Sequence, residues 1–355
     1  MELVQNIRIQ KAKYTALQDV DFNSLEFGKY VCDHMFRCSF RDGSWQQAQI
    51  QPFQNLSLSP LTLALHYGQS IFEGMKAFRM KDGRINIFRL EKHHARLNES
   101  LRRMCMPAVP LDLFTIALEE LVKIDRNWIP EAEGAALYLR PLIFASEARF
   151  GVKVAEEYEF LIVAGPVPQL YPRPISVKVE QKFIRAANGG TGYAKCAGNY
   201  GGAFYPTQLA RQEGFDQVIW TDAMEHEYFE ESGTMNLMFV IDGALITPPL
   251  SDSILDGITR DSLLILAKEL GISVEERPIG IGEVVNAFSK GTITEAFGAG
   301  TAAIVAPIAS MGIGDEVYEL PAYNEKNLVF VLKRELEAIR YGKKEDRRNW
   351  NHIIS

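Results

Sequence analysis

Cysteine is scarce in this chain, and its few cysteines lack metal-binding spacing. Among 355 residues there are four, at positions 32, 38, 105 and 196, and no two of them form a CxxC pair. Closely paired cysteines build zinc sites and disulfide frameworks. We therefore expect neither a metal centre nor disulfides, and the composition favours a reducing compartment.

A long apolar run and an excess of positive charge are also missing. No apolar stretch reaches the roughly 20 residues that a membrane-spanning helix needs, and MELVQNIRIQKAKYT at the start contains no signal-peptide core. The formal net charge is −7, which argues against nucleic acid or an acidic membrane surface as the main partner. We expect a cytoplasmic protein.

A proline-rich stretch suggests where the chain divides. Its length of 355 residues is typical of two domains, and four prolines fall within GPVPQLYPRP. Such segments commonly join domains. We therefore predict a smaller N-terminal α/β domain at 1–165, a linker at 166–174 and a larger C-terminal domain at 175–355.

Helical and strand patterns mix without strict alternation, which predicts an α+β fold. Asp82-Gly83 and Asp242-Gly243 lie between apolar runs and predict hairpins. Apolar positions at helical spacing predict helices over 90–104, 112–124 and 327–339, with another beginning near Thr259. The remaining patterns predict strands at 135–144, 158–167, 175–180, 215–222, 228–249 and 292–308. They also predict an irregular, polar segment with short strand-like pieces at 1–60 and a surface tail at 343–355.

The glycine-rich stretch NGGTGYAKCAGNYGGA, residues 188–203, places Lys195 among small residues. A P-loop requires glycine before its lysine and Ser or Thr after it, and a dinucleotide fingerprint requires glycine where Lys195 stands. A lysine shielded from water is a nucleophile, because burial favours the neutral amine. Two interpretations stay open at this point: a lysine that forms a Schiff base, and a plain flexible loop.

Two further features are candidates for anion binding, and each has an ordinary explanation as well. Arg96 lies just beside the apolar stripe of its helix, where a solvated arginine is common. Thr259 begins a helix after Gly257, so free backbone N–H groups there could hold an anion, although threonine caps many helices.

Three features of the predicted strands have the same two kinds of explanation. Glu231 sits at the end of a strand, where an acid is usually solvated. Thr301 belongs to a second glycine-rich turn, with Gly298 and Gly300, after which Ala302 and Ala303 offer backbone N–H groups. The same residues could also form a simple strand bend. Tyr138 and Arg140 share one face of a strand, so the arginine there has an anion as partner or lies on a solvated edge.

Together these features suit pyridoxal phosphate (PLP), which needs a lysine for its Schiff base, a carboxylate for its ring nitrogen and anion-binding groups for its phosphate. From about residue 28 to its end, the chain resembles the branched-chain-amino-acid aminotransferases, PLP enzymes of fold type IV. A single matching motif would be weak, but six in the family's order are specific. The matching segments are HYGQSIFEGMKAF, LYLRPLIF, GYAKCAGNY, EESGTMN, LDGITRDS and FGAGTAA.

The resemblance implies a role for each matching residue. Lys195 resembles the Schiff-base lysine and proton carrier, Glu231 the partner of the pyridine nitrogen, and Tyr200 the tyrosine at the ring oxygen. Glu230 is set aside because alternation points it to the other face of the strand. The implied phosphate ligands are Arg96, Ile258, Thr259 and Thr301. The implied substrate-binding residues are Tyr67, Phe72 and Gly74 as pocket walls, Tyr138, Ala302 and Ala303 for the α-carboxylate, and Arg140 for the side-chain carboxylate of glutamate.

The resemblance also implies a two-domain, D-amino-acid aminotransferase-like fold with PLP between the domains, and a homodimer or higher homo-oligomer. The expected reaction is ping-pong transamination of leucine, isoleucine or valine with 2-oxoglutarate. Ala303 and Ala306 stand where mammalian members carry a redox-sensitive CxxC, so thiol regulation of that type is not expected. The competing hypotheses are another fold-type-IV enzyme, such as a D-amino-acid aminotransferase, and a non-catalytic anion-binding protein.

Overall fold

The chain forms two compact units in a computed structural model that describes residues 7–168, 171 and 173–354. Unit 1 comprises residues 1–169, 194–198 and 339–355, and unit 2 comprises 170–193 and 199–338. The break after Gln169 falls within the segment predicted as a linker, where Gln169, Leu170 and Pro172 lie outside the described residues. The division is not a single cut, because the short segment around Lys195 and the C-terminal residues cluster with unit 1.

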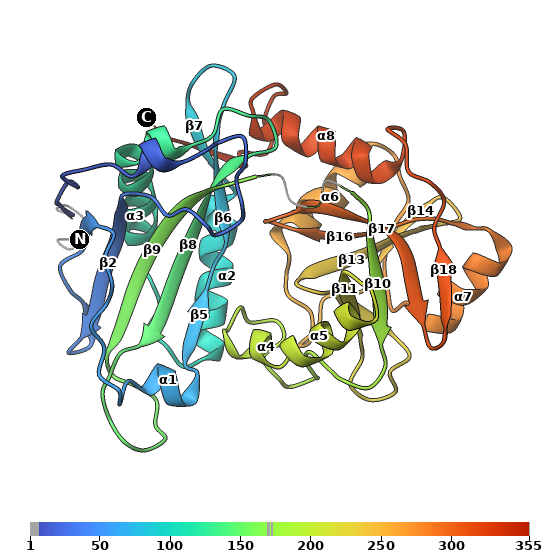
Figure 1. Cartoon of the computed structure of the whole chain (residues 1–355), viewed down its shortest axis with the longest axis horizontal. Coiled ribbons are helices and arrows are strands. Elements are labelled where there is room, and N and C mark those ends of the chain that lie inside the picture. The colour runs from blue at the N-terminus through green and yellow to red at the C-terminus, as the bar shows by residue number, and fades with distance from the viewer. Residues whose placement is uncertain (1–6, 169–170, 172, 355) are drawn as a thin grey trace. The chain divides into compact units, whose positions relative to one another are not determined.

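Unit 1 is built on a sheet of ten strands, with helices α2 and α3 beside it (Figure 1). The strand order is β1-β4-β2-β9-β8-β6-β7-β19, and β3 and β5 pair with β2 and β8. The strands are β1 (Arg8–Ile9), β2 (His34–Arg41), β3 (Ser44–Trp45), β4 (Gln49–Pro52), β5 (Ser70–Phe72), β6 (Met75–Arg79), β7 (Ile85–Phe88), β8 (Ala136–Ala145), β9 (Tyr158–Val167) and β19 (Asn351–Ile354). The helices are α1 (Leu63–Tyr67), α2 (Leu90–Arg103) and α3 (Leu111–Ile124), with 3-10 turns at Leu17–Asp19 and Arg126–Trp128.

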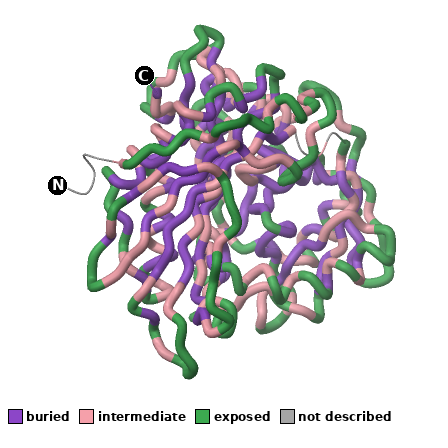
Figure 2. Tube along the Cα trace, turned by 60° about the vertical axis from the view of Figure 1, so that its left-hand side comes forward, coloured by how far each residue is buried: buried purple, intermediate pink, exposed green. Residues whose placement is uncertain are grey.

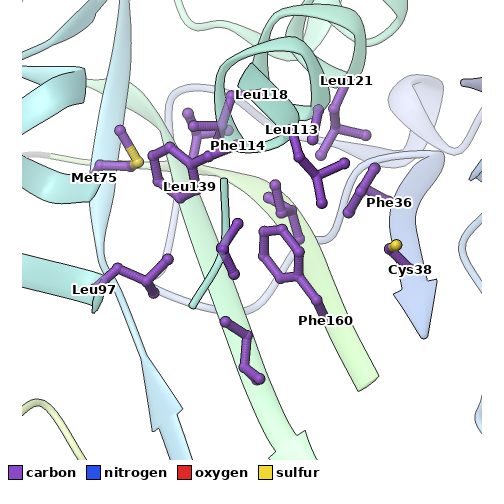
Figure 3. Close-up of a cluster of buried hydrophobic side chains, with 14 of the residues drawn as sticks. Phe36, Cys38, Met75, Leu97, Leu113, Phe114, Leu118, Leu121, Leu139 and Phe160 are labelled. Carbon is purple, nitrogen blue, oxygen red and sulfur yellow. The ribbon is translucent and has the colours of Figure 1, made fainter. Parts of the chain in front are cut away.

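The core of unit 1 follows from the apolar stripe of α3. Phe114 and three leucines of α3 (Leu113, Leu118 and Leu121) point toward the strands, where Phe36, Leu139 and Phe160 meet them (Figure 3). These side chains are almost completely buried, and each contributes about 1.5–3 kcal/mol by leaving water. This packing holds β8, the strand that carries Tyr138 and Arg140, in a rigid place.

Unit 2 contains a sheet of nine strands, and six of them close into a ring. The ring runs β12-β11-β10-β17-β16-β13 and returns to β12, while β14, β15 and β18 extend it. The strands are β10 (Ile175–Glu180), β11 (Gln217–Thr221), β12 (Phe229–Ser232), β13 (Met235–Ile241), β14 (Ala244–Thr247), β15 (Val274–Glu276), β16 (Ile293–Gly300), β17 (Ile304–Ile313) and β18 (Glu316–Glu319). The helices are α4 (Gly198–Gly201), α5 (Phe204–Gln212), α6 (Ile258–Glu269), α7 (Ile281–Lys290) and α8 (Leu328–Arg340). Buried residues follow the strands of each unit and exposed residues follow the loops (Figure 2).

Most local predictions are confirmed. Both Asp-Gly pairs form hairpin turns, between β6 and β7 and between β13 and β14. The four predicted helices correspond to α2, α3, α6 and α8, and the strands predicted at 135–144, 158–167, 175–180 and 215–222 correspond to β8, β9, β10 and β11. Strand β9 extends to Val167, so the first residues assigned to the linker belong to a strand.

One prediction is wrong and two are incomplete. Residues 292–308 form parts of two antiparallel strands, β16 and β17, instead of one, because the chain turns at 301–303. The C-terminal tail is not only surface, since β19 pairs with β7. The segment 1–60 contains the expected strand-like pieces, but one of them, β2, is an eight-residue strand paired with β9 and is longer than predicted. Among the described residues, no helix is long and apolar enough to cross a membrane.

Candidate active site

Lys195 is held by its backbone against two elements of unit 1. Its N–H donates to Ser100 Oγ at 2.9 Å, on α2, and its carbonyl accepts from Phe72 N at 3.0 Å, at the end of β5. Ala197 N donates to Ser70 O at 3.0 Å, so the contact with β5 continues along the chain. The side chain reaches back, with Nζ 4.9 Å from the centre of the Phe72 ring. The lysine therefore has a fixed backbone and a defined direction.

Four of the predicted substrate residues lie together in the same unit. Arg140 Cζ is 4.6 Å from the centre of the Phe72 ring, and Arg140 Nη2 donates to Tyr138 Oη at 3.0 Å. A Cβ atom added to Gly74 would stand 2.0 Å from Tyr138 Oη, so only glycine leaves room for that hydroxyl. Tyr67 differs from them, since it is half exposed at the end of α1 and contacts the His66 ring at 5.9 Å.

A buried ion pair that the motifs did not reveal holds Arg96. Glu73 Oε1 accepts from Arg96 Nε at 2.7 Å, and Oε2 accepts from Arg96 Nη2 at 2.8 Å and lies 2.9 Å from His93 Nδ1. Burial raises the pKa of Glu73, but the charge and hydrogen bonds of Arg96, together with His93, outweigh it and hold that pKa well below its usual range. Burial lowers the pKa of His93 to about 4 against the pull of Glu73. At neutral pH this is a charged pair beside a neutral imidazole.

Glu231 is a buried carboxylate of unit 2 that is held by three other residues. Its Oε1 accepts from Leu255 N at 2.9 Å and from Asn236 Nδ2 at 3.2 Å, and its Oε2 lies 3.1 Å from Arg185 Nε. The neighbouring Glu230 is also buried but accepts from Ser253 Oγ. Burial raises the pKa of Glu230 against the opposing effects of Ser253 and Arg185. Two adjacent acids therefore have different partners, and Glu231 is the one with a paired cation.

The start of α6 has the features of an anion site. Gly257 precedes the helix, and an added Cβ there would lie 1.7 Å from Asn236 Oδ1, so the helix start packs on the residue that holds Glu231. Thr259 is buried, and its Oγ1 has no hydrogen-bond partner among the described residues. A buried hydroxyl without a partner costs free energy, so this one is poised for a ligand at a helix N-terminus. Ile258 lies beside it in the first turn.

The predicted turn at Thr301, Ala302 and Ala303 connects β16 and β17. A Cβ added to Gly298 would stand 2.7 Å from Met235 Cε, so the glycine strand lies directly on that methionine. Ile304 closes the turn with φ of 67°, a conformation that a β-branched residue rarely adopts. Such strain persists where the surrounding structure fixes it, and it is frequent at binding sites.

The glycine-rich stretch is an ordered segment with its own hydrogen bonds. Thr191 Oγ1 donates to Asn199 Oδ1 at 2.7 Å, and Asn199 Nδ2 donates back to Thr191 O at 2.8 Å. Tyr193 N donates to Asp252 O at 2.9 Å. Tyr200 lies within the short helix α4. These bonds explain Thr191 structurally and exclude a plain flexible loop.

Each unit thus gathers its own set of the predicted residues. Unit 1 contains Lys195, Arg96 and the group of Phe72, Gly74, Tyr138 and Arg140; unit 2 contains Tyr200, Glu231, the start of α6 and the turn at 301–303. Sequence reasoning missed Glu73, Asn236 and Arg185. Glu73 had one usable signal, a lone carboxylate in the apolar run SIFEGM, because a charge in such a run needs a partner.

Comparisons with known proteins identify the family of this chain. The family model for amino-transferase class IV matches residues 70–311. Branched-chain-amino-acid aminotransferase 2 of Bacillus subtilis (strain 168) is 40% identical over 355 residues, which cover 99% of this chain and 98% of that protein.

Solved structures show the same fold. A branched-chain amino acid aminotransferase from Escherichia coli has a TM-score of 0.73 at 26% identity, covering 91% of this chain and 99% of that one. The branched-chain amino acid aminotransferase from Thermobaculum terrenum, solved in its PLP form, has a TM-score of 0.73 at 24% identity, covering 91% of this chain and 98% of that one. Since the family model spans parts of both units and the similarity extends over nearly the whole chain, the chain belongs to the class IV aminotransferases of fold type IV, in the group of branched-chain-amino-acid aminotransferases.

Proposed function

We propose that this aminotransferase uses PLP to exchange amino groups between leucine, isoleucine or valine and 2-oxoglutarate, giving branched-chain 2-oxo acids and L-glutamate in a ping-pong cycle. One observation carries the proposal. Lys195 Nζ and Arg140 Cζ lie 4.9 and 4.6 Å from the centre of the same Phe72 ring. An amine and a carboxylate-binding cation on one apolar ring suit a site that must accept aliphatic and carboxylate side chains in turn.

The residues of unit 2 fit the cofactor. The unpartnered buried hydroxyl of Thr259, at the first turn of a helix, suits a phosphate oxygen. Glu231, with a cation at one oxygen and two N–H donors at the other, suits a protonated pyridine nitrogen. PLP, when bound, supplies an electron sink for the carbanion at the substrate Cα. We assign the nitrogen to Glu231, the phosphate to Arg96, Ile258, Thr259 and Thr301, and the ring oxygen to Tyr200.

Lys195 is assigned the proton transfers. In the half-reaction that consumes an amino acid, its amine takes the proton from the substrate Cα and delivers it to the cofactor carbon bonded to the same nitrogen. In the half-reaction that consumes a 2-oxo acid, it carries a proton in the opposite direction, to the substrate Cα. The hydrogen bonds of its backbone to Ser100 and Phe72 keep that amine within reach of both atoms. Because the backbone is fixed in advance, little ordering is needed at the moment of reaction.

We assign Arg140 to binding the side-chain carboxylate of glutamate. Its guanidinium donates to Tyr138 and stacks on Phe72, so it is held in one orientation before a substrate arrives. A glutamate side chain then gains charge-assisted hydrogen bonds, whereas a leucine side chain gains the apolar face of Phe72. Tyr138, with the N–H groups of Ala302 and Ala303, is assigned the α-carboxylate, and Tyr67 and Gly74 are assigned to the walls. The cytoplasmic location, expected from the composition, and the homodimer, implied by the family resemblance, stay predictions.

The test combines chemistry and specificity. Purified protein given PLP is expected to be yellow, and borohydride reduction should fix the cofactor on Lys195, as peptide mass mapping would show. L-Leucine with 2-oxoglutarate should yield L-glutamate, whereas D-alanine should not react. Appreciable transamination by Lys195→Ala, or a preference for D-alanine, would contradict the proposal.

A further inference from the structure

Arg185 lies between β10 and the glycine-rich stretch of unit 2, and no motif accounts for it. Only 9% of its side chain is exposed, and that of Glu231 is 4% exposed. Its Nε lies 3.1 Å from Glu231 Oε2, and its Nη2 donates to the carbonyls of Gly192, at 3.3 Å, and Ser253. One side chain thus reaches a carboxylate and two loops.

The positive charge of Arg185 offsets the repulsion between two buried carboxylates. Glu230 and Glu231 are adjacent and both buried, at 9% and 3% exposed. Two carboxylates in one buried place cannot both ionise easily, and one tends to keep a proton. Asp222 adds further negative charge near Glu230. A guanidinium stays protonated at any working pH, so Arg185 favours the ionised form of the acid that it contacts.

We propose that Arg185 is a positioning residue that keeps Glu231 ionised and its carboxylate oriented toward the pyridine nitrogen of the cofactor. The inference rests on the function proposed for Glu231. A protonated Glu231 could not hold that nitrogen in its protonated form, and the electron sink would weaken. Arg185 acts through Glu231 and needs no contact with the cofactor.

Arg185 also has a second role, which follows from its hydrogen bonds to the backbone carbonyls of Gly192 and Ser253. A Cβ added to Gly192 would lie 2.6 Å from Ser253 Cα, so the glycine-rich segment packs directly on the loop that leads to α6. Arg185 donates to one carbonyl on each side of that contact. The same side chain therefore fixes the loop around Leu255, whose N–H donates to Glu231. Both effects of Arg185 meet at the Glu231 carboxylate.

Four variants of the full-length holoenzyme separate these effects. Arg185→Met removes the charge, Arg185→Lys keeps it without the planar fork, and Glu231→Gln removes the acid, alone and combined with Arg185→Met. Arg173→Met is the control, because Arg173 is 72% exposed and pairs with Asp216 on the surface of the same unit. The readouts are the absorption spectrum of bound PLP against pH, the dissociation constant of PLP, and kcat and KM for leucine.

We expect a wild-type spectrum that does not change between about pH 6 and 9, and a spectrum of Arg185→Met that titrates in that range as Glu231 takes up a proton. In Arg185→Met, kcat should fall about tenfold or more with little change in KM, and Arg185→Lys should recover most of it. On the Glu231→Gln background, Arg185→Met should add less than about a twofold loss, because residues that act as one unit are not additive.

Three results would overturn the proposal. The first is a pH-independent spectrum and unchanged kcat in Arg185→Met. The second is a loss of kcat on adding Arg185→Met to Glu231→Gln that is as large as the loss on adding it to the wild type, since Arg185 would then act independently of Glu231. If Arg185→Met does not fold, Arg185→Lys decides, because a titrating spectrum with the charge retained contradicts the proposal. Wild-type protein that binds no PLP overturns the proposed function itself and this inference with it, whereas the first two results leave that function intact.

Discussion

Glutamine at position 73 tests how strongly the buried ion pair stabilises unit 1. Glu73 is completely buried, and the Arg96 side chain is 7% exposed. Glutamine has nearly the same shape but no charge, so Glu73→Gln leaves the Arg96 guanidinium in the interior without its counter-ion. Arginine cannot lose its proton to escape this situation.

The expected loss is a large part of the folding free energy. Removing one partner of a buried ion pair costs about 3–5 kcal/mol, because the other charge stays uncompensated. The hydrogen bond of His93 survives in part, since the amide oxygen of glutamine still accepts from Nδ1, so we expect about 3 kcal/mol. Domains are commonly stable by about 5–15 kcal/mol, so this change is easily measured.

The assay is urea unfolding of the apoprotein, followed by tryptophan fluorescence. Three of the four tryptophans, Trp45, Trp128 and Trp350, belong to unit 1, so the signal reports mainly on that unit. The matched control is Glu99→Gln on α2, the helix that carries Arg96, because Glu99 and Arg102 form an exposed pair, 44% and 70% exposed. Exposed pairs contribute about 1 kcal/mol or less. A loss in Glu73→Gln no larger than in Glu99→Gln would refute the reasoning.

Four further predictions follow from single contacts. Burial lowers the pKa of His93 to about 4; the unfolded chain, with its histidine near 6.5, takes up the proton first as pH falls. The contribution of His93 to the free energy of unfolding is therefore fully present above about pH 6.5 and smaller by about 3 kcal/mol near pH 4. Urea unfolding of His93→Asn at different pH values should lack this pH dependence. Thr259→Val should leave the thermal stability of the apoprotein unchanged or slightly higher, since the buried hydroxyl has no partner among the described residues. In a fluorescence titration the same variant should weaken PLP binding about tenfold or more. Arg140→Met should slow the single-turnover reaction with glutamate about 10- to 100-fold and that with leucine by less than about threefold. In Gly74→Ala the new Cβ would lie 2.0 Å from Tyr138 Oη, so the displaced phenol should raise KM for leucine about tenfold in steady-state assays.

Patterns that depend on neighbours in the chain were predicted well. The hairpin at Asp82-Gly83 and the helices over 90–104 and 112–124 rest on turn chemistry and helical spacing, which are local. Strand β19 was missed because its partner is β7, far away in the chain. Nothing in the charged sequence around Asn351 indicates that pairing, since strand partners are set by tertiary packing.

The chain reversal at 301–303 was predicted only as one of two alternatives, a glycine-rich turn or a bend within one strand. Glycines usually mark bends, and Gly298 and Gly300 precede the turn, which made one strand with a bend plausible. The structure assigns these glycines to close packing on Met235 instead. The chain reverses after them, at residues with no strong turn signal, and Ile304 takes the positive φ.

Alternation along β12 separated Glu231 from Glu230, but the physical difference between them lies elsewhere. All four residues of β12 are buried, so neither acid faces solvent. What distinguishes them is their partners: Arg185, Leu255 and Asn236 for Glu231, and Ser253 for Glu230. These partners come from three other segments of the chain, and periodicity within one strand cannot reveal them.

Asn236 explains why the order of the motifs was more informative than any single motif. Its Nδ2 donates to Glu231 Oε1 at 3.2 Å and to Leu255 O at 2.9 Å, and its Oδ1 occupies the space that a Cβ on Gly257 would need. The segments EESGTMN and LDGITRDS are therefore one packed structure, in which a single amide orients a carboxylate and the start of a helix. Each segment alone describes an ordinary strand end or an ordinary helix start. A carboxylate and a helix N-terminus fixed by the same side chain, however, are what a ligand with a basic nitrogen and a phosphate requires.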